Sequence, residues 1–342
     1  MAGRALLDET ARRFPAWPSD VPPEELLRFY FTHTATQVAA PSTLVDLMAV
    51  VRSWRPDVVV HDPAEFAGPI AAAWAGIPGV NHGWGPLLPL EEYHLAGEVV
   101  APLWKRIGVE PATPGGMFDH LYIDICPPGL QTADVGDLDA RQALRPLPVH
   151  LRLGRHPHGV GPLPPWVQHL DALPLVYATL GTVFNNTPGL FATIAEGLGD
   201  LEVNAVLAVG LDGDPAAVAG PPTRIHIEGY VPQSLVLPRC HVVICHGGAG
   251  TILAAMGAGV PVLCLPVGLD QFHNARRCEA AGVGRWLARS EVGPAAIRRE
   301  IRILLGEPSY RLRARDLQGE VRAMPNADEV VARLQGLISA AG

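Results

Sequence analysis

Strand-like and helix-like segments alternate through the second half of the sequence, and this alternation limits the fold more than any other feature. Apolar, strand-like runs occupy residues 174–182, 203–210, 241–248 and 261–267, and a further strand opens the stretch 223–240. Segments with helical spacing occupy residues 189–199, 251–259, 270–282 and 294–306. Strands that alternate with helices form a parallel sheet covered on both faces. The second half is therefore predicted to be an α/β domain.

The first half contains a similar but shorter unit. Residues 55–63 read as a short buried strand, residues 67–78 as a helix of small residues, and residues 79–85 as a second strand that ends in a glycine loop. Residues 86–150 alternate helix-like stretches with proline-rich loops. The first half is thus expected to hold another α/β unit.

The length of 342 residues favours two domains. Residues 151–166 carry the weakest signal for regular structure, which makes this region a candidate interdomain linker. We therefore expect an N-terminal domain over residues 1–155, a linker over residues 156–173 and a C-terminal domain over residues 174–342.

The charge pattern excludes several classes of partner. The chain has 26 basic and 34 acidic residues and a net charge of −8, and the basic residues form no block, so no nucleic-acid partner is expected. Residues 1–14 contain acidic side chains where a signal peptide would need an apolar core. No run of about 20 apolar residues is present to span a membrane. We therefore expect a soluble, cytoplasmic protein without a membrane span.

The cysteines are odd in number and form no CxxC pair. The five positions are Cys126, Cys240, Cys245, Cys264 and Cys278. Buried free thiols are the favoured interpretation, because a metal site would need closely spaced ligands. No metal site is predicted.

The stretch "HGGAGT", residues 246–251, stands between a predicted strand and a predicted helix. Ligands of open α/β sheets bind at the carboxyl ends of strands, and the first turn of a helix offers unpaired N–H groups to a phosphate. Glycines allow a phosphate to approach the backbone, and Thr251 can cap the helix or donate to a phosphate oxygen. His246 adds another donor, and a phosphate would raise its pKa. An anion-binding turn is therefore predicted.

Two neighbouring strand ends strengthen this interpretation. Gly181 and Thr182 follow one strand, and Asp270 and Gln271 follow another. A dinucleotide-binding site is an alternative interpretation, because Asp270 lies about 20 residues beyond the glycines. The GxGxxG pattern needs a third glycine where the chain has Leu253, so a dehydrogenase is disfavoured.

The same residues carry a family resemblance. The segment "GYVPQSLVLPRCHVVICHGGAGTILAAMGAGVPVLCLPVGLDQFHNARRCEAAGVG", residues 229–284, resembles the donor-binding signature of family 1 glycosyltransferases. The bacterial branch that decorates antibiotics and other natural products with deoxysugars is the most similar. "YATLGTVFN", residues 177–185, resembles the start of that family's C-terminal domain, and residues 55–85 resemble its N-terminal domain more loosely. The resemblance covers most of residues 25–342.

The resemblance implies the GT-B fold, in which two Rossmann-like domains face each other across a cleft, with the N-terminal domain incomplete here. It implies an inverting, metal-independent transfer of a sugar, expected to be a deoxyhexose, from an NDP-sugar of TDP or UDP type to a hydroxyl of a small natural-product acceptor. The nucleotide sugar is then a co-substrate, and no further cofactor is implied. A homodimer is compatible with the sequence, which does not determine the oligomeric state.

The family pattern also implies roles for individual residues. Tyr230 and Val231 would lie against the nucleobase, and Asp270 and Gln271 would hydrogen-bond sugar hydroxyls. The residues implied around the diphosphate are Gly181, Thr182, His246, Gly248, Gly250 and Thr251.

The catalytic base departs from the family pattern. The family places a histidine on a glycine-rich loop after its first strand, and residues 1–24 offer no counterpart. Asp62 matches the aspartate that orients this histidine. His82 is a weaker candidate for the base, and the residues expected to line an acceptor pocket are His33, His82 and Trp84. The chain is therefore expected to bind a donor but to transfer sugar poorly, with a non-catalytic partner or remnant as the alternative function.

Overall fold

The computed structural model describes residues 3–17, 20–146, 166–167, 170, 172–181, 189–210, 213–218 and 224–341. The backbone divides into two compact units. The N-terminal unit comprises residues 1–126, 131–145 and 324–342, and the C-terminal unit comprises residues 127–130 and 146–323. Most of the linker predicted over residues 156–173 lies outside the described residues.

The N-terminal unit contains a four-stranded parallel sheet in the order β1-β2-β3-β4. The strands are β1 (Val59–His61), β2 (Gly79–His82), β3 (Leu121–Asp124) and β4 (Arg141–Ala143). The strands predicted within residues 55–63 and 79–85 are confirmed. Sequence reasoning missed β3 and β4, because β4 has three residues without apolar alternation and β3 is a four-residue run lying among proline-rich loops.

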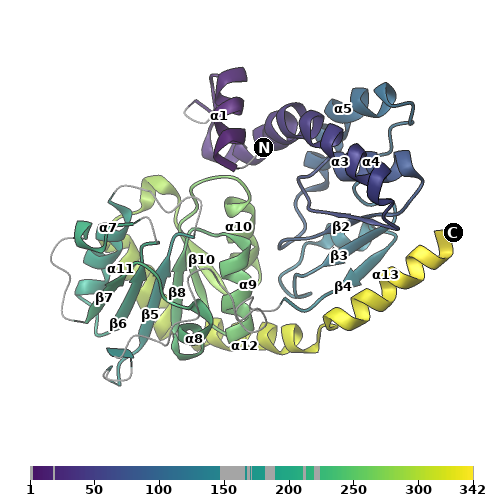
Figure 1. Cartoon of the computed structure of the whole chain (residues 1–342). Helices are drawn as coiled ribbons and strands as arrows, with labels where there is room; N and C mark the ends of the chain where they lie inside the picture. Colours follow the sequence, from purple (N-terminus) through teal and green to yellow (C-terminus); the bar gives the residue numbers. More distant parts are fainter. Residues whose placement is uncertain are drawn as a thin grey trace. The chain divides into compact units, whose positions relative to one another are not determined.

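A group of helices packs on one face of this sheet or on one another (Figure 1). They are α1 (Gly3–Arg13), α2 (Leu26–Phe29), a π-helical segment (Tyr30–Ala39), α3 (Ala40–Trp54), α4 (Ala67–Ala75) and α5 (Leu90–Arg106), with short 3₁₀ turns at Pro23–Glu25 and Ala133–Asp137. The helical run Pro23–Trp54 is long and apolar enough to cross a membrane by length and composition. It supplies Phe31, Ala35 and Leu44 to the core of this unit, as a core helix of a globular domain does.

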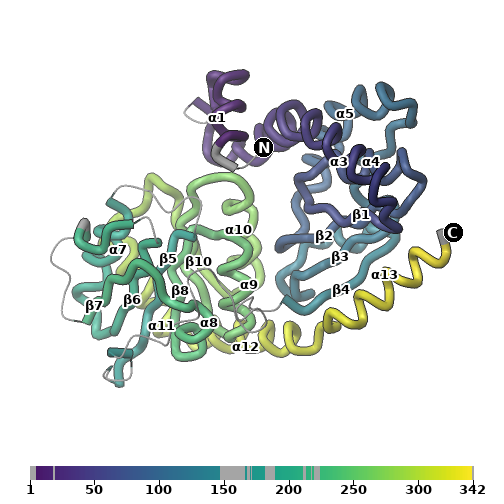
Figure 2. The backbone as a smooth tube through the Cα atoms, viewed as in Figure 1, coloured from purple at the N-terminus to yellow at the C-terminus, as the bar shows by residue number. Residues whose placement is uncertain are grey.

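The last helix, α13 (Ala327–Ala341), covers the other face of the same sheet. Val330 of α13 packs against Val80, Leu121 and Ile123, and Figure 2 shows the yellow trace of α13 running beside β4. The predicted C-terminal domain extended to residue 342, whereas this helix belongs to the N-terminal unit. The physical reason is that the apolar side of α13 covers sheet residues of that unit.

The C-terminal unit contains a six-stranded parallel sheet in the order β10-β9-β8-β5-β6-β7. The strands are β5 (Leu175–Thr179), β6 (Asn204–Ala208), β7 (Ile225–Glu228), β8 (Val242–Cys245), β9 (Val262–Cys264) and β10 (Gly284–Trp286). Except for β10, these strands were predicted. β10 was missed because it has three residues and little apolar pattern.

Helices lie on both faces of this sheet. They are α7 (Leu190–Gly199), α8 (Gln233–Val236), α9 (Ala249–Ala258), α10 (Gln271–Ala280), α11 (Pro294–Gly306) and α12 (Pro308–Ala323), with 3₁₀ turns at Pro215–Ala217, Leu237–Arg239 and Arg289–Glu291. Helices α7 and α11 pack together on one face, and α9 packs with α12 (Figure 1). The α/β prediction for this half of the chain is confirmed.

All five cysteines are buried free thiols, as predicted. The Sγ atoms of Cys245 and Cys264 lie 3.9 Å apart on neighbouring strands β8 and β9. The cysteines therefore fill the interior, mostly in the C-terminal sheet and its helices.

Candidate functional site

The order of the C-terminal sheet defines where a ligand can bind. The chain continues from β5 to β6 on one side, while β8, the other neighbour of β5, begins the series that runs to β9 and β10. This change of direction between β5 and β8 is a topological switch point, and such points open a crevice outside the carboxyl ends of the strands. Gly181 follows β5 and His246 follows β8, so both lie at this position.

The ring of His246 is held between two glycines. A Cβ atom added to Gly181 would lie 2.5 Å from Cε1 of His246, and a Cβ atom added to Gly248 would lie 2.4 Å from Nε2. Both distances are shorter than real Cβ contacts allow. The structure therefore brings together three of the predicted residues, and a side chain at either glycine would displace the ring of His246.

His246 is buried, with 9% of its surface exposed. Burial lowers its pKa to about 4, because the charged ring loses solvation. Its buried Nδ1 atom has no hydrogen-bond partner among the described residues. The ring is thus neutral at pH 7 and carries a polar atom that is left for a ligand.

Helix α9 begins directly after this histidine. Gly248 is its N-cap residue, and its carbonyl oxygen accepts hydrogen bonds from the N–H groups of Thr251 and Ile252 at 3.2 Å. The first N–H groups of any α-helix lack partners within the helix and carry partial positive charge. Gly250 is exposed and Thr251 is half-buried in this first turn. The turn has the geometry of the predicted anion site. Thr182 lies outside the described residues.

A second loop joins this turn from the end of β9. Gln271 is 2% exposed, and its Oε1 atom accepts hydrogen bonds from the N–H groups of Val267 at 2.8 Å and Gly268 at 3.2 Å. Both hydrogen bonds to this oxygen come from within the loop. Of the two polar atoms of the Gln271 side chain, the amide nitrogen is then the candidate for the predicted sugar contact. Asp270 is half-buried, and burial raises its pKa, while a hydrogen bond from Asn274 lowers it.

Sequence reasoning missed Asn274. Its Nδ2 atom donates to Oδ2 of Asp270 at 2.7 Å and to the carbonyl oxygen of Gly247 at 3.0 Å. The spacing of four residues from Asp270 on helix α10 was the available signal, because such residues share a helix face.

The proposed nucleobase residues differ in exposure. Tyr230 is 42% exposed and Val231 is 2% exposed. The side chain of Tyr230 is therefore accessible to a ligand, whereas that of Val231 is not.

In the N-terminal unit, Asp62 directly follows β1, and His82 is the last residue of the adjacent strand β2. His61 pairs with Asn81 in the register of β1 and β2, so Asp62 and His82 are the next residues at the same edge of the sheet. Asp62 is exposed, and its Oδ1 atom accepts a hydrogen bond from the N–H of Ala64 at 2.7 Å. His82 is half-buried. His61 is buried, and burial lowers its pKa to about 4. The two adjacent residues His61 and Asp62 thus differ in exposure.

The other two acceptor candidates make packing contacts. His33 stacks on Phe29 with ring centroids 4.4 Å apart, and its edge meets Phe14 at 4.7 Å. Trp84 packs against the core of the N-terminal unit, and its buried Nε1 atom has no hydrogen-bond partner among the described residues. These contacts show that both rings support the fold, whatever else they bind.

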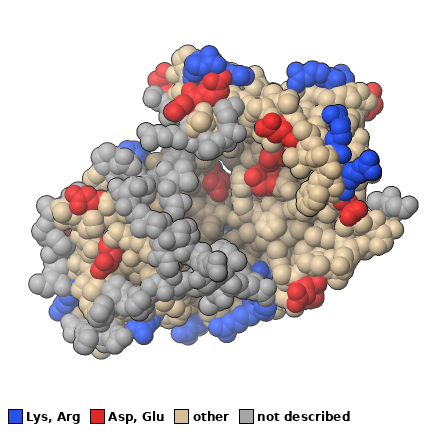
Figure 3. Space-filling view, viewed as in Figure 1, with Lys and Arg blue, Asp and Glu red and all other residues tan. Residues whose placement is uncertain are grey.

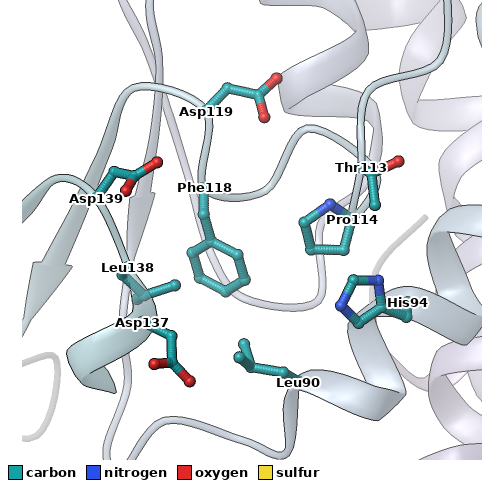
Figure 4. Close-up of a pocket in the computed structure, with 9 residues that line it drawn as sticks. All are labelled: Leu90, His94, Thr113, Pro114, Phe118, Asp119, Asp137, Leu138 and Asp139. Atoms are coloured by element: carbon teal, nitrogen blue, oxygen red, sulfur yellow. The ribbon is translucent and has the colours of Figure 1, made fainter. Parts of the chain in front are cut away.

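The described cavities include one of about 410 Å³ in the N-terminal unit (Figure 4). Its lining comprises Leu90, His94, Thr113, Pro114, Phe118, Asp119, Asp137, Leu138 and Asp139. Figure 4 shows the ring of Phe118 between Pro114 and Leu138. None of the three predicted acceptor residues lines this cavity.

The distribution of charged and metal-ligating side chains bears on the binding of nucleic acid and of metal ions. On the face drawn in Figure 3, acidic and basic side chains are interspersed without a continuous basic patch. Within the described part of the chain, no group of three or more His, Cys, Asp or Glu side chains could hold a metal ion.

Comparison with known proteins identifies relatives over both units. Residues 24–138 and 192–337 match the N-terminal and C-terminal domains of the family described as erythromycin biosynthesis protein CIII-like. The chain is 30% identical over 285 residues to the elloramycin glycosyltransferase ElmGT of Streptomyces olivaceus, covering 82% of this chain and 68% of that protein. It is 29% identical over 315 residues to the 3-alpha-mycarosylerythronolide B desosaminyl transferase of Saccharopolyspora erythraea, covering 88% and 73%.

Solved structures give the same result for the fold. The spinosyn rhamnosyltransferase SpnG in complex with thymidine diphosphate superimposes with a TM-score of 0.77 at 26% identity, over 95% of this chain and 84% of that chain. SpnG has also been solved in complex with spinosyn aglycone.

Proposed function

The chain belongs to the erythromycin biosynthesis protein CIII-like glycosyltransferases, and we propose that its C-terminal unit binds a thymidine diphosphate sugar at the switch point between β5 and β8. It has the GT-B fold, and its relatives transfer sugars in natural-product biosynthesis. The protein is a glycosyltransferase that moves a sugar from an NDP-sugar to a natural-product acceptor. Thymidine as the nucleoside is proposed because SpnG is solved with thymidine diphosphate.

The arrangement around His246 supports this proposal more than any other observation. A neutral, buried histidine with an unpartnered Nδ1 atom lies directly before the first turn of α9. Its neighbours Gly181 and Gly248 leave the space beside the ring free of side chains. A diphosphate at this position meets backbone N–H groups, the helix dipole and a ring donor.

The proposed reaction places negative charge on the departing nucleoside diphosphate, which the site has to stabilise. The acceptor oxygen forms a bond to the anomeric carbon while the bond from that carbon to the diphosphate oxygen breaks, and the electron pair leaves with the nucleoside diphosphate. The configuration at the anomeric carbon is inverted. Donors fixed before the reaction stabilise the departing charge without having to reorganise. We assign this task to His246 and the N-terminus of α9, and sugar contacts to Asp270 and the amide nitrogen of Gln271.

The acceptor side of the proposal rests on the strand ends of the N-terminal unit. The proton of the acceptor hydroxyl needs a base within hydrogen-bond reach. Asp62 and His82 lie on neighbouring strand ends, and we assign the base to this pair. Trp84 and His33 are proposed as more distant contributors to the acceptor pocket. A deoxyhexose as the sugar, a cytoplasmic location and a homodimer also stay proposals.

Isothermal titration of the whole chain with TDP and with UDP tests the donor site. We expect TDP to bind, and His246→Ala to weaken this binding by about 1.5–3 kcal/mol, the usual value for a hydrogen bond to a charged group. Absence of binding by either nucleotide would contradict the proposed site. Transfer from a TDP-sugar to a panel of polyketide and phenolic acceptors, followed by mass spectrometry, then separates a working transferase from a non-catalytic donor-binding protein.

A further inference from the structure

We propose that Asn274 is a positioning residue of the donor site, which ties the phosphate-binding turn after β8 to the carboxylate that meets the sugar. This inference rests on the proposed donor-binding function of His246 and Asp270. The residue roles that the family resemblance implies do not include this asparagine.

One amide group makes both connections. Nδ2 of Asn274 lies 2.7 Å from Oδ2 of Asp270 and 3.0 Å from the carbonyl oxygen of Gly247. Gly247 stands between His246 and Gly248 in the phosphate-binding turn. An amide nitrogen has two hydrogens, and each is used here. Asn274 is 1% exposed, so water does not compete for these hydrogen bonds.

The position of Asn274 in the fold favours this role. Asp270 is the N-cap residue of α10, and the N–H of Asn274 donates to the Asp270 carbonyl oxygen at 2.9 Å. Helix α10 thus fixes the two side chains on one face, while the turn after β8 belongs to a different element. Asn274 therefore fixes the distance between the part of the site assigned to the diphosphate and the part assigned to the sugar.

The bond also affects the carboxylate itself. Burial raises the pKa of Asp270, and the hydrogen bond from Asn274 lowers it. A carboxylate that accepts from an amide keeps its remaining lone pairs in a fixed direction. The expected consequence is an oriented acceptor for a sugar hydroxyl, without contact between Asn274 and the sugar.

A purely structural role makes a different prediction. If Asn274 only holds the fold, its loss should weaken TDP and TDP-sugar binding equally, and it should add to the effect of losing Asp270. A residue that acts through Asp270 should instead affect the sugar-bearing ligand more, and the extra loss for that ligand should vanish once Asp270 is removed.

The experiment is isothermal titration of the whole chain with TDP and TDP-glucose. The variants are Asn274→Ala, Asp270→Ala and the double variant. Gln318→Ala is the matched control, because its Nε2 atom donates to the carbonyl oxygen of Gly257 at 3.0 Å, at the other end of α9. Circular dichroism checks that each variant folds.

We expect Asn274→Ala to lower TDP-glucose affinity about tenfold or more, as for other bonds to charged groups, and TDP affinity by less. Relative to Asp270→Ala, the double variant should lose no more TDP-glucose affinity than Asn274→Ala loses for TDP, and Gln318→Ala should match the wild type. Equal losses for both ligands, or additive losses in the double variant, would overturn the proposal.

A second variant covers the case in which Asn274→Ala does not fold. Asn274→Ser keeps a hydroxyl that can donate one hydrogen bond but cannot bridge, and the same difference between the ligands is expected. Failure of both variants to fold would assign Asn274 to the fold alone and overturn the proposal. Failure of the wild type to bind TDP or TDP-glucose would instead contradict the proposed donor site.

Discussion

A Cβ atom placed on Gly181 would lie 2.5 Å from Cε1 of His246, so the backbone that follows β5 packs directly against the His246 ring that follows β8. The backbone of Gly181 also has φ of +76°, which side-chain-bearing residues rarely adopt. Two independent constraints therefore require glycine here, and both concern the geometry of the proposed diphosphate site.

Gly248→Ala tests the contact without a backbone effect. Gly248 has φ of −65° and ψ of 135°, which alanine adopts readily, yet its Cβ atom would meet Nε2 of His246 at 2.4 Å. The ring must therefore move, and we expect TDP affinity to fall about tenfold or more, as on loss of a bond to a charged group. Titration measures this effect. Gly257→Ala on the same helix is the control, because its Cβ atom meets nothing within 4 Å. Unchanged TDP affinity in Gly248→Ala would show that the ring position does not matter.

Gly250→Ala separates ligand approach from stability. A Cβ atom at Gly250 meets nothing within 4 Å in the free protein, and the residue lies within α9. Alanine in a helix is more stable than glycine by about 0.5–1 kcal/mol, so the melting temperature should rise. TDP binding should nevertheless weaken, because the new methyl group would occupy space that a phosphate needs. Gly257→Ala should raise stability alone. Equal TDP affinity in both variants would remove Gly250 from the site.

Acid should destabilise the protein through two buried histidines. The pKa values of His61 and His246 are both lowered to about 4 by burial, from an ordinary value near 6.5. Between these pH values the unfolded chain binds protons that the folded chain does not, so stability falls as the pH decreases from about 6.5 to 4. Each histidine contributes up to about 3 kcal/mol to this loss.

Thermal unfolding of the wild type and His246→Gln at pH 7.5, 6 and 5 measures this contribution. The variant has no imidazole at that position, so its stability should depend less steeply on pH. The same slope in both proteins would mean that His246 is not buried as a neutral ring.

The local structure around the proposed donor site could be predicted from the sequence, because its signals lie within a few residues. An apolar run followed by His246 and glycines indicates a strand that ends at a helix N-terminus. The contact between Gly181 and His246 could not be predicted in the same way, because it depends on β5 lying beside β8 in the sheet order. The hydrogen bonds of Asn274 and those accepted by the Gln271 side-chain oxygen could not be predicted either, because they also depend on which backbone groups lie nearby. Spacing indicates a shared helix face but does not identify the partner atoms.

The N-terminal unit was less predictable. Strands β3 and β4 are short and show little alternation of apolar and polar residues, so their sequences do not differ from those of loops. Helix α13 has an apolar side that could cover either sheet, and nothing in its local sequence indicates that it packs on Val80 and Leu121. The choice between the two sheets is a tertiary effect.

The assignment of the base to Asp62 and His82 gives the last prediction. Asp62 directly follows β1 and His82 ends β2, one residue beyond the paired residues His61 and Asn81. Asp62→Asn and His82→Gln keep the size of each side chain and remove its ability to take a proton at neutral pH. A positioned base typically contributes 10²- to 10⁴-fold to the rate, so kcat for sugar transfer should fall by about this factor for the variant that lacks the base. TDP affinity should not change in either variant, because the proposed donor contacts come from the C-terminal unit.

Sugar transfer and TDP titration are measured on the same preparations of each variant. His94→Gln serves as the histidine control, because His94 lies away from these two strand ends. A loss of TDP binding would indicate misfolding, and wild-type kcat in both variants would place the base elsewhere.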